Sequence, residues 1–128
     1  MGGDIALGAA VDFINELGHE NIRQYENDLL NYAQQKLLEI GGLKIFGEKA
    51  QRAGVVSFIL ENAGIASDAG MILDKMGIAV RTGHHCTQPI MSFFNIAGTV
   101  RASFAVYNTF EEIDLLADGI RKAQRMLM

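Results

Sequence analysis

The C-terminal stretch TVRASFAVYNTFEEIDLLADGIRKAQRMLM, residues 99–128, decides the fold. Over 99–106 apolar residues alternate with Arg101 and Ser103. This period of two is typical of a strand with one apolar and one polar face. The spacing therefore predicts a strand over 99–106, with both polar side chains on the face away from the core.

The second half of this stretch predicts a helix. Thr109, with Glu112 three residues later, forms a capping box that begins the helix. A single apolar stripe then continues to the C-terminus at helical spacing. Its members are Ile113, Leu116, Ala117, Ile120, Ala123 and Leu127. We expect this stripe to pack on the sheet that the preceding strand joins.

The N-terminal part of the chain also reads as helical. Apolar residues recur at three- and four-residue steps over 4–17 and again over 22–40. Gly18 ends the first segment and the Gly41-Gly42 pair ends the second. His19 lies in the turn between the two predicted helices, where a solvated or capping role is expected.

The middle of the chain alternates between strands and a helix. β-branched and aromatic runs predict strands over 43–46 and 55–60. Ser67 is the predicted cap of a helix that Gly77 ends, and a further strand over 78–81 follows. Helices at both ends with strands between them predict an α+β fold, in which helices cover a small, mainly antiparallel sheet.

Length and composition restrict the kinds of protein that this chain can be. It has 128 residues, the size of a single domain. Hydrophobic residues make up 49% and charged residues 20%, which excludes a disordered chain. Eleven Lys+Arg against fifteen Asp+Glu give a net charge of -4, without the basic surplus that phosphates require. Nucleic acid is therefore not an expected partner.

Cysteine usage and hydropathy predict a location. Cys86 is the only cysteine, so the chain has no intramolecular disulfide, and a reducing, cytoplasmic location is expected. No apolar run approaches the roughly 20 residues of a membrane-spanning helix. The N-terminus lacks the basic and apolar segments of a signal peptide. We expect neither export nor a membrane partner.

The stretch RTGHHCTQP, residues 81–89, carries the densest chemistry in the chain. It follows a predicted strand and places the only cysteine beside two of the three histidines. A cysteine attacks as a thiolate, and Arg81 or a protonated histidine nearby favours that form. Cys86 is therefore a candidate nucleophile. The alternative is a buried thiol that only fills space.

Imidazole and thiolate also bind zinc, so His84, His85 and Cys86 invite a metal hypothesis. Adjacent side chains in an extended loop point apart, however, and His19 has no companion ligand near it in sequence. We therefore predict no metal site.

Arg81 and Arg101 lie on two different predicted strands near the cysteine loop. A guanidinium fork can hold a carboxylate through two parallel hydrogen bonds. Together the two arginines could hold an α-carboxylate. The alternative for each is a structural ion pair or a solvated position.

The motif at 81–89, together with VRASFAVYNT at 100–109 and EEID at 111–114, closely resembles pyridoxal-phosphate-dependent cysteine desulfurases. The resemblance is to the SUF-type (group II) branch, which includes selenocysteine lyase-like members. It extends over nearly the whole chain.

The resemblance implies roles for particular residues in a full-length enzyme that uses pyridoxal 5'-phosphate. Cys86 would take sulfur from L-cysteine or L-selenocysteine as a persulfide, leaving L-alanine. A sulfur-acceptor protein would receive that sulfur for iron–sulfur cluster assembly. Arg101 would bind the substrate carboxylate, and Arg81 would lie at the same site. His84 and His85 would support the loop.

The family also has a large domain whose lysine forms the Schiff base with the cofactor. The five lysines here, at 36, 44, 49, 75 and 122, lie outside any such motif. We therefore expect residues 1–128 to be one domain, resembling the C-terminal small domain of fold-type I transferases. The large domain would be absent and the chain alone inactive. The implied partners are that large domain and a second copy in a homodimer.

Two other functions compete with this interpretation. The chain could be a non-enzymatic folded module that binds a partner or itself through the surface that a large domain would cover. It could also be a small zinc protein, a hypothesis that depends only on the His-His-Cys cluster.

Overall fold

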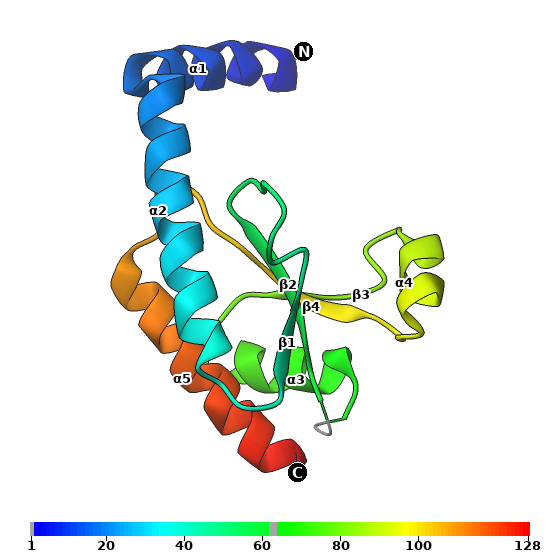
Figure 1. Ribbon diagram of the computed structural model, residues 1–128. Coiled ribbons are helices and arrows are strands. Elements are labelled where there is room, and N and C mark those ends of the chain that lie inside the picture. The colour runs from blue at the N-terminus through cyan, green and yellow to red at the C-terminus, as the bar shows by residue number, and fades with distance from the viewer. Residues whose placement is uncertain (1, 62–63) are drawn as a thin grey trace.

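The computed structural model describes residues 2–61 and 64–128, which form five helices and four strands (Figure 1). In chain order these are α1 (Gly2–Leu17), α2 (His19–Leu38), β1 (Leu43–Phe46), β2 (Val55–Leu60), α3 (Ala66–Lys75), β3 (Arg81–Gly83), α4 (Gln88–Phe94), β4 (Thr99–Ser103) and α5 (Phe110–Leu127).

The four strands form one antiparallel sheet in the spatial order β1-β2-β4-β3. β4 is therefore an inner strand, paired with β2 on one side and with the short edge strand β3 on the other. The predicted α+β fold with a small antiparallel sheet is confirmed.

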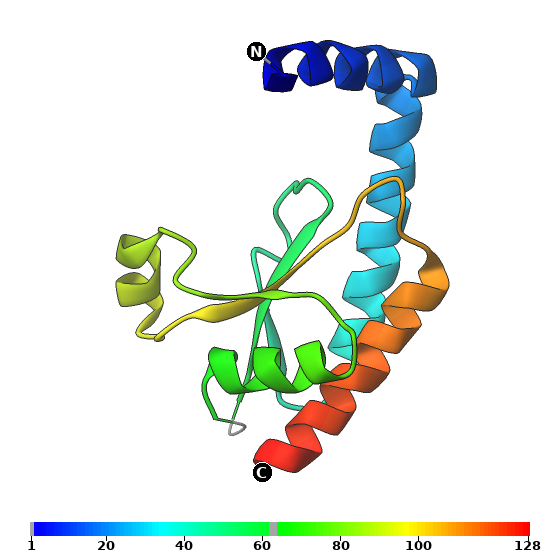
Figure 2. The same cartoon turned by 180° about the vertical axis from the view of Figure 1, so that it is seen from behind.

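Helices α2, α3 and α5 cover one face of this sheet, as the front and back views show (Figures 1 and 2). The alternation predicted for 99–106 places Val100 and Ala102 in this core, and both are buried. The largest fully buried side chains are Phe58, Leu29, Leu37, Leu73, Ile113, Ile120, Val56 and Val100. Each such burial stabilises the fold by about 1.5–3 kcal/mol before conformational entropy is counted.

Polar contacts connect α2 to α5 and to the segment that precedes α5. The Tyr32 hydroxyl donates to the Asp114 carboxylate at 2.9 Å, and Lys36 Nζ lies 3.1 Å from the same group. Hydrogen bonds from Lys36 and Tyr32 hold the pKa of Asp114 below its usual value. Tyr25 donates to the Asn108 carbonyl at 2.7 Å. The two long helices are therefore fixed in register on the core.

Helix α1 forms where it was predicted, but it projects away from the sheet (Figure 1). None of its described residues is buried, and its apolar side chains are exposed, with Ile5 at 78% and Leu7 at 65%. Phe13 stacks on Tyr107, with ring centroids 6.5 Å apart. Within the described residues, none of the helices combines the length and the apolar character needed to cross a membrane.

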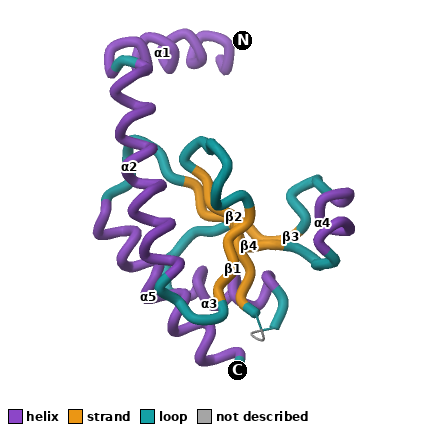
Figure 3. Tube along the Cα trace, in the orientation of Figure 1, coloured by secondary structure: helices purple, strands orange, loops and turns teal. Residues whose placement is uncertain are grey.

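Two strands, both drawn in Figure 3, differ from their predicted ranges: β3 covers 81–83 instead of 78–81, and β4 covers 99–103 instead of 99–106. β3 starts at Arg81 because Ile78 instead packs its side chain on Gly119 of α5. β4 ends at Ser103 because the Asn108 side chain accepts a hydrogen bond from Ala105 N–H at 2.9 Å, closing a turn.

Two helix predictions also need correction. Ser67 does not cap α3: the cap position is Ile65, without a side-chain hydrogen bond, and Ser67 lies in the first turn. Helix α4 was not predicted at all. It begins just after Thr87, carries Pro89 in its first turn and ends at Asn95 in the left-handed conformation.

The predicted capping box of α5 is confirmed. Glu112 N–H donates to Thr109 Oγ1 at 3.3 Å, and Thr109 N–H donates to the Glu112 carboxylate at 3.1 Å. That carboxylate also accepts from Asn108 Nδ2 at 2.9 Å. The Asn108 bond, followed by the Thr109 bond, holds the pKa of Glu112 below its usual value.

We predict that Thr109→Ala lowers the free energy of unfolding by about 1 kcal/mol, the usual cost of losing an N-cap side chain. Urea titration of the 128-residue chain measures this change. Thr109→Ser, which keeps the hydroxyl, is the control and should lose much less. Equal stability of the alanine and serine variants would show that the cap does not stabilise α5.

Candidate functional site

The candidate site lies on the sheet face opposite the core, where β3 pairs with β4. The register sets Arg81 directly opposite Arg101 and Gly83 opposite Thr99. Across the other edge of β4, Arg101 faces Ser57 on β2. Directly opposed residues share a face of the sheet, so both arginines and Ser57 point to the same side.

The two arginines bring like charges together. Cβ atoms of directly opposed residues in an antiparallel pair lie about 4.5–5.5 Å apart, and like charges there are destabilising. Among the residues that the structure describes, neither arginine has an acidic partner within ion-pair distance. Arg101 Nε is buried without a hydrogen-bond partner in that same part of the chain. This arrangement is suited to an anion with two oxygens.

Cys86 is exposed on a tight turn that leaves β3. The His84 carbonyl accepts hydrogen bonds from Thr87 N–H at 2.9 Å and from Thr87 Oγ1 at 2.7 Å. Cys86 N–H donates to His84 Nδ1 at 3.1 Å. His85 and Cys86 have φ angles of 54° and 60°. Residues with side chains rarely adopt this left-handed conformation, and such strain clusters at functional sites.

The His85 side chain anchors this turn to β4. Its Nε2 lies 3.0 Å from Thr99 Oγ1 and 3.2 Å from the Thr99 carbonyl oxygen. Burial holds the pKa of His85 below its usual value, and the charges of Arg101, Arg81 and His84 lower it further. This shift favours the neutral form of the ring, although the hydrogen bond to the Thr99 backbone acts in the opposite direction.

The chain returns to β4 through a close backbone approach. A Cβ at Gly98 would lie only 2.8 Å from the carbonyl carbon and oxygen of Gly83. Gly83 itself has a φ of 115°, which side chains disfavour. Only glycine lets the two backbones meet here, and this contact fixes both ends of the cysteine loop.

A hollow of about 370 Å³ opens beside this loop. Its polar lining residues are Ser57, His85, Thr87, Thr99 and Arg101. Phe46 and Phe94 are part of its apolar wall, and their ring centroids lie 5.0 Å apart. Cys86 lies in the chain between two of the polar lining residues. The hollow therefore joins Arg101 and His85, and Cys86 follows His85 in the chain without lining the hollow itself.

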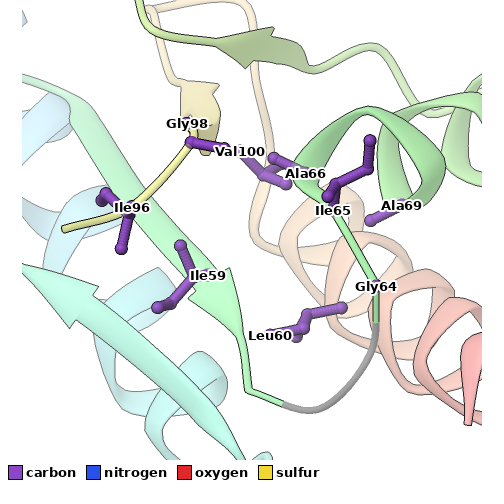
Figure 4. Close-up of a pocket in the computed structure, with 10 residues that line it drawn as sticks. Ile59, Leu60, Gly64, Ile65, Ala66, Ala69, Ile96, Gly98 and Val100 are labelled. Atoms are coloured by element: carbon purple, nitrogen blue, oxygen red, sulfur yellow. The ribbon is translucent and has the colours of Figure 1, made fainter. Parts of the chain in front are cut away.

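A second hollow, of about 160 Å³, lies between β2, β4 and the start of α3 (Figure 4). The side chains labelled there, among them Ile59, Leu60 and Ile65, carry only carbon (Figure 4). The described residues that line it include no charged or nucleophilic side chain. It therefore has no groups for catalysis.

The structure brings β4, with Thr99 and Arg101, beside the motif at 81–89, which carries Arg81, His85 and Cys86. It leaves His19 apart, at the first residue of α2. No cluster of three or more His, Cys, Asp or Glu with metal-binding geometry occurs over residues 2–61 and 64–128.

Sequence reasoning missed Thr99, Ser57 and the whole of α4 as parts of this site. For the first two, the period-two pattern gave the face of the strand but not its cross-strand neighbours. Helix α4 buries only Met91, which is too little to produce a helical period.

Fold and site together define an α+β domain that presents a surface thiol on a turn between two adjacent strands, each carrying an arginine. Residues 2–116 match the aminotransferase class-V family. The chain belongs to that family.

Curated proteins that are similar to the chain include cysteine desulfurases. The chain is 47% identical over 125 residues to one from Serratia proteamaculans (strain 568) and 44% identical over 126 residues to one from Escherichia coli (strain K12 / DH10B). Each alignment covers 98% of this chain and 30% of the relative. The chain therefore spans about 30% of the length of these relatives.

Solved structures of cysteine desulfurases also superpose on the chain. The apo cysteine desulfurase from Thermococcus onnurineus NA1 superposes with a TM-score of 0.89 at 36% identity, covering 98% of this chain and 32% of that one. The Escherichia coli cysteine desulfurase CsdA, in its S-sulfonic acid form, superposes with a TM-score of 0.87 at 28% identity, covering 97% and 30%.

We predict that Arg81→Thr stabilises the chain, because it removes one of two opposed like charges. The expected gain is about 0.2–1 kcal/mol at low salt, and it shrinks as salt is added. Urea titrations at several salt concentrations measure it. Lys44→Thr is the control, since it removes the same charge from a strand position opposite Ile59. A stability change in Arg81→Thr equal to that of the control would contradict repulsion between the arginines.

Proposed function

We propose that residues 1–128 are the small domain of a pyridoxal-phosphate-dependent cysteine desulfurase, a sulfurtransferase, in which Cys86 accepts the sulfur of L-cysteine. The observation that carries the proposal is the exposed Cys86 turn beside the opposed arginines. The cysteine desulfurases to which the chain is similar support it. Delivery of the sulfur to an acceptor protein for iron–sulfur cluster assembly, in the cytoplasm, is part of the same proposal.

The described residues do not by themselves suit the cofactor. Pyridoxal phosphate, when bound, acts as an electron sink for the substrate carbon and is held through a lysine. None of the five lysines of the chain lines the hollow beside Cys86. In the proposal, that lysine belongs to a large domain, and the present chain supplies the groups that meet the substrate.

The arginines bind and orient the substrate. A carboxylate between Arg81 and Arg101 compensates their repulsion and gives Arg101 Nε the acceptor that it lacks. Charge-assisted hydrogen bonds to a planar guanidinium fix the orientation of the carboxylate as well as its position. L-selenocysteine offers the same carboxylate and is therefore an equally suitable substrate class.

Cys86 then receives the sulfur. Its thiolate attacks the substrate sulfur, an S–S bond forms and the substrate C–S bond breaks. The electron pair of that bond stays on the substrate carbon, which takes up the proton of the substrate thiol. The products are a persulfide on Cys86 and L-alanine. Because Cys86 is exposed on a surface turn, an acceptor protein can reach the persulfide.

The exposed α1 helix supports a partner for this domain. Ile5, Leu7 and Val11 project into solvent on a helix with no buried residue among those described. We assign this surface to the large domain, with a homodimer as a second contact. The same surface favours the competing function, a non-enzymatic module that self-associates. Activity of the full-length protein distinguishes the two.

We predict that Cys86→Ala in the full-length protein abolishes transfer of sulfur from L-cysteine. Alanine release and sulfide release after reduction measure the reaction. Ser92→Ala is the control, because it removes a polar atom of similar size from exposed α4. Wild-type turnover in Cys86→Ala would refute the acceptor role. A wild-type protein without pyridoxal-phosphate-dependent turnover would favour the non-enzymatic module.

We predict that Arg101→Lys weakens the apparent affinity for L-cysteine by about 1.5–3 kcal/mol, because a point charge loses the two-pronged geometry. Steady-state kinetics over a range of L-cysteine concentrations measure the loss. Arg121→Lys is the matched control, since Arg121 pairs with Asp118 and Glu39 away from the site. Unchanged kinetics in Arg101→Lys would remove Arg101 from the substrate site.

A further inference from the structure

The contact between His85 and Thr99 favours one of the two neutral forms of the ring. His85 Nε2 lies within hydrogen-bond distance of both the Thr99 hydroxyl and the Thr99 carbonyl oxygen. A carbonyl oxygen can only accept, so that contact is a hydrogen bond only when Nε2 is the donor. In a neutral ring, Nδ1 then carries a lone pair and no hydrogen.

This Nδ1 is buried and has no hydrogen-bond partner among the residues that the structure describes. Arg101 Nε is the second buried atom without a partner near the site, and both residues line the same hollow. One of these atoms is an acceptor and the other is a donor. Buried polar groups in native proteins are nearly always paired. The two atoms together therefore indicate a ligand that offers a hydrogen-bond donor to Nδ1 and an acceptor to Arg101 Nε.

The surroundings keep Nδ1 an acceptor rather than a cation. Burial lowers the pKa of His85, the hydrogen bond to the Thr99 backbone opposes this, and the charges of Arg101, Arg81 and His84 lower it further, with a net lowering. A protonated ring would place a further positive charge beside both arginines. With hydrogen on Nε2, Nδ1 of the neutral ring can only accept, so the group that pairs with it is a hydrogen-bond donor.

We propose that His85 contacts the substrate, with Nδ1 accepting a hydrogen bond from the thiol of a β-thiol carboxylate whose carboxylate lies on Arg101, and that Thr99 positions His85 for this role. The inference rests on the proposed function and extends it to the placement of the substrate sulfur. His85 immediately precedes Cys86 in the chain, so the residue that would hold the substrate thiol lies on the same turn as the residue that would receive its sulfur.

The first test requires no ligand. Nitrogen NMR of the 15N-labelled chain distinguishes a protonated ring nitrogen from an unprotonated one. The proposal requires hydrogen on Nε2 and none on Nδ1 of His85 near pH 7. Hydrogen on Nδ1 would overturn the proposal. In Thr99→Val, which keeps the shape and leaves the backbone carbonyl of residue 99 as the remaining partner, hydrogen should stay on Nε2, because a carbonyl can only accept.

The second test uses two probes, 3-mercaptopropionate and propionate, under reducing conditions. They share the carboxylate and differ at the β-carbon, where only the first has a thiol. We expect both to shift the Arg101 Nε–H resonance, and only 3-mercaptopropionate to shift His85 Nδ1. The thiol probe should bind about twofold to tenfold more tightly, which is the range of one net hydrogen bond.

Two variants distinguish the inference about His85 from the proposed carboxylate site on Arg101. His85→Asn tolerates the left-handed backbone at this position and should erase the difference between the probes without removing propionate binding. His19→Asn, far from the site, should keep the difference. If both probes shift Arg101 but bind equally in the wild-type chain, the inference about His85 is wrong while the carboxylate site stands. If neither shifts Arg101, the carboxylate site is wrong as well.

Discussion

The pairing of β3 with β4 is the constraint on which the rest of the site depends. This short ladder places Arg81 opposite Arg101 and so holds two positive charges together on the face of the sheet opposite the core helices α2, α3 and α5. A shift of one residue would turn Arg81 to the core face. The backbone contact between Gly83 and Gly98 prevents such a shift, because it fixes the chain at both ends of the cysteine loop.

The remaining elements support this arrangement. Helices α2, α3 and α5 form the core behind the sheet, and β4 is an inner strand between β2 and β3. Gly70 lets α3 approach β3 closely, since a Cβ there would lie 2.4 Å from the Thr82 side chain. The opposed like charges and the strained turn destabilise the fold. Burial in a core that does not take part in the chemistry offsets this loss of stability. This division is common where stability and function compete.

Local patterns in the sequence predicted the local structure well. The alternation around Arg101 gave the buried face of β4, and the Thr109–Glu112 pair gave the start of α5, because both depend on neighbours in the chain. The resemblance of the motif at 81–89 identified the family. Contacts between distant residues left no such signal. The register of Arg81 on Arg101 and the contact of His85 with Thr99 depend on how the strands align in three dimensions.

The exposure of α1 was not predicted either, since an apolar stripe has the same period whether its partner lies within the chain or outside it.

The central claim is that Cys86 receives sulfur beside the arginine pair. The most direct measurement is peptide mass analysis of the full-length protein after a single turnover with L-cysteine. Our account predicts one additional sulfur atom on the peptide that contains Cys86, in amounts that match the alanine released. Alanine release with the sulfur on another residue, or free in solution before any reductant is added, would contradict it.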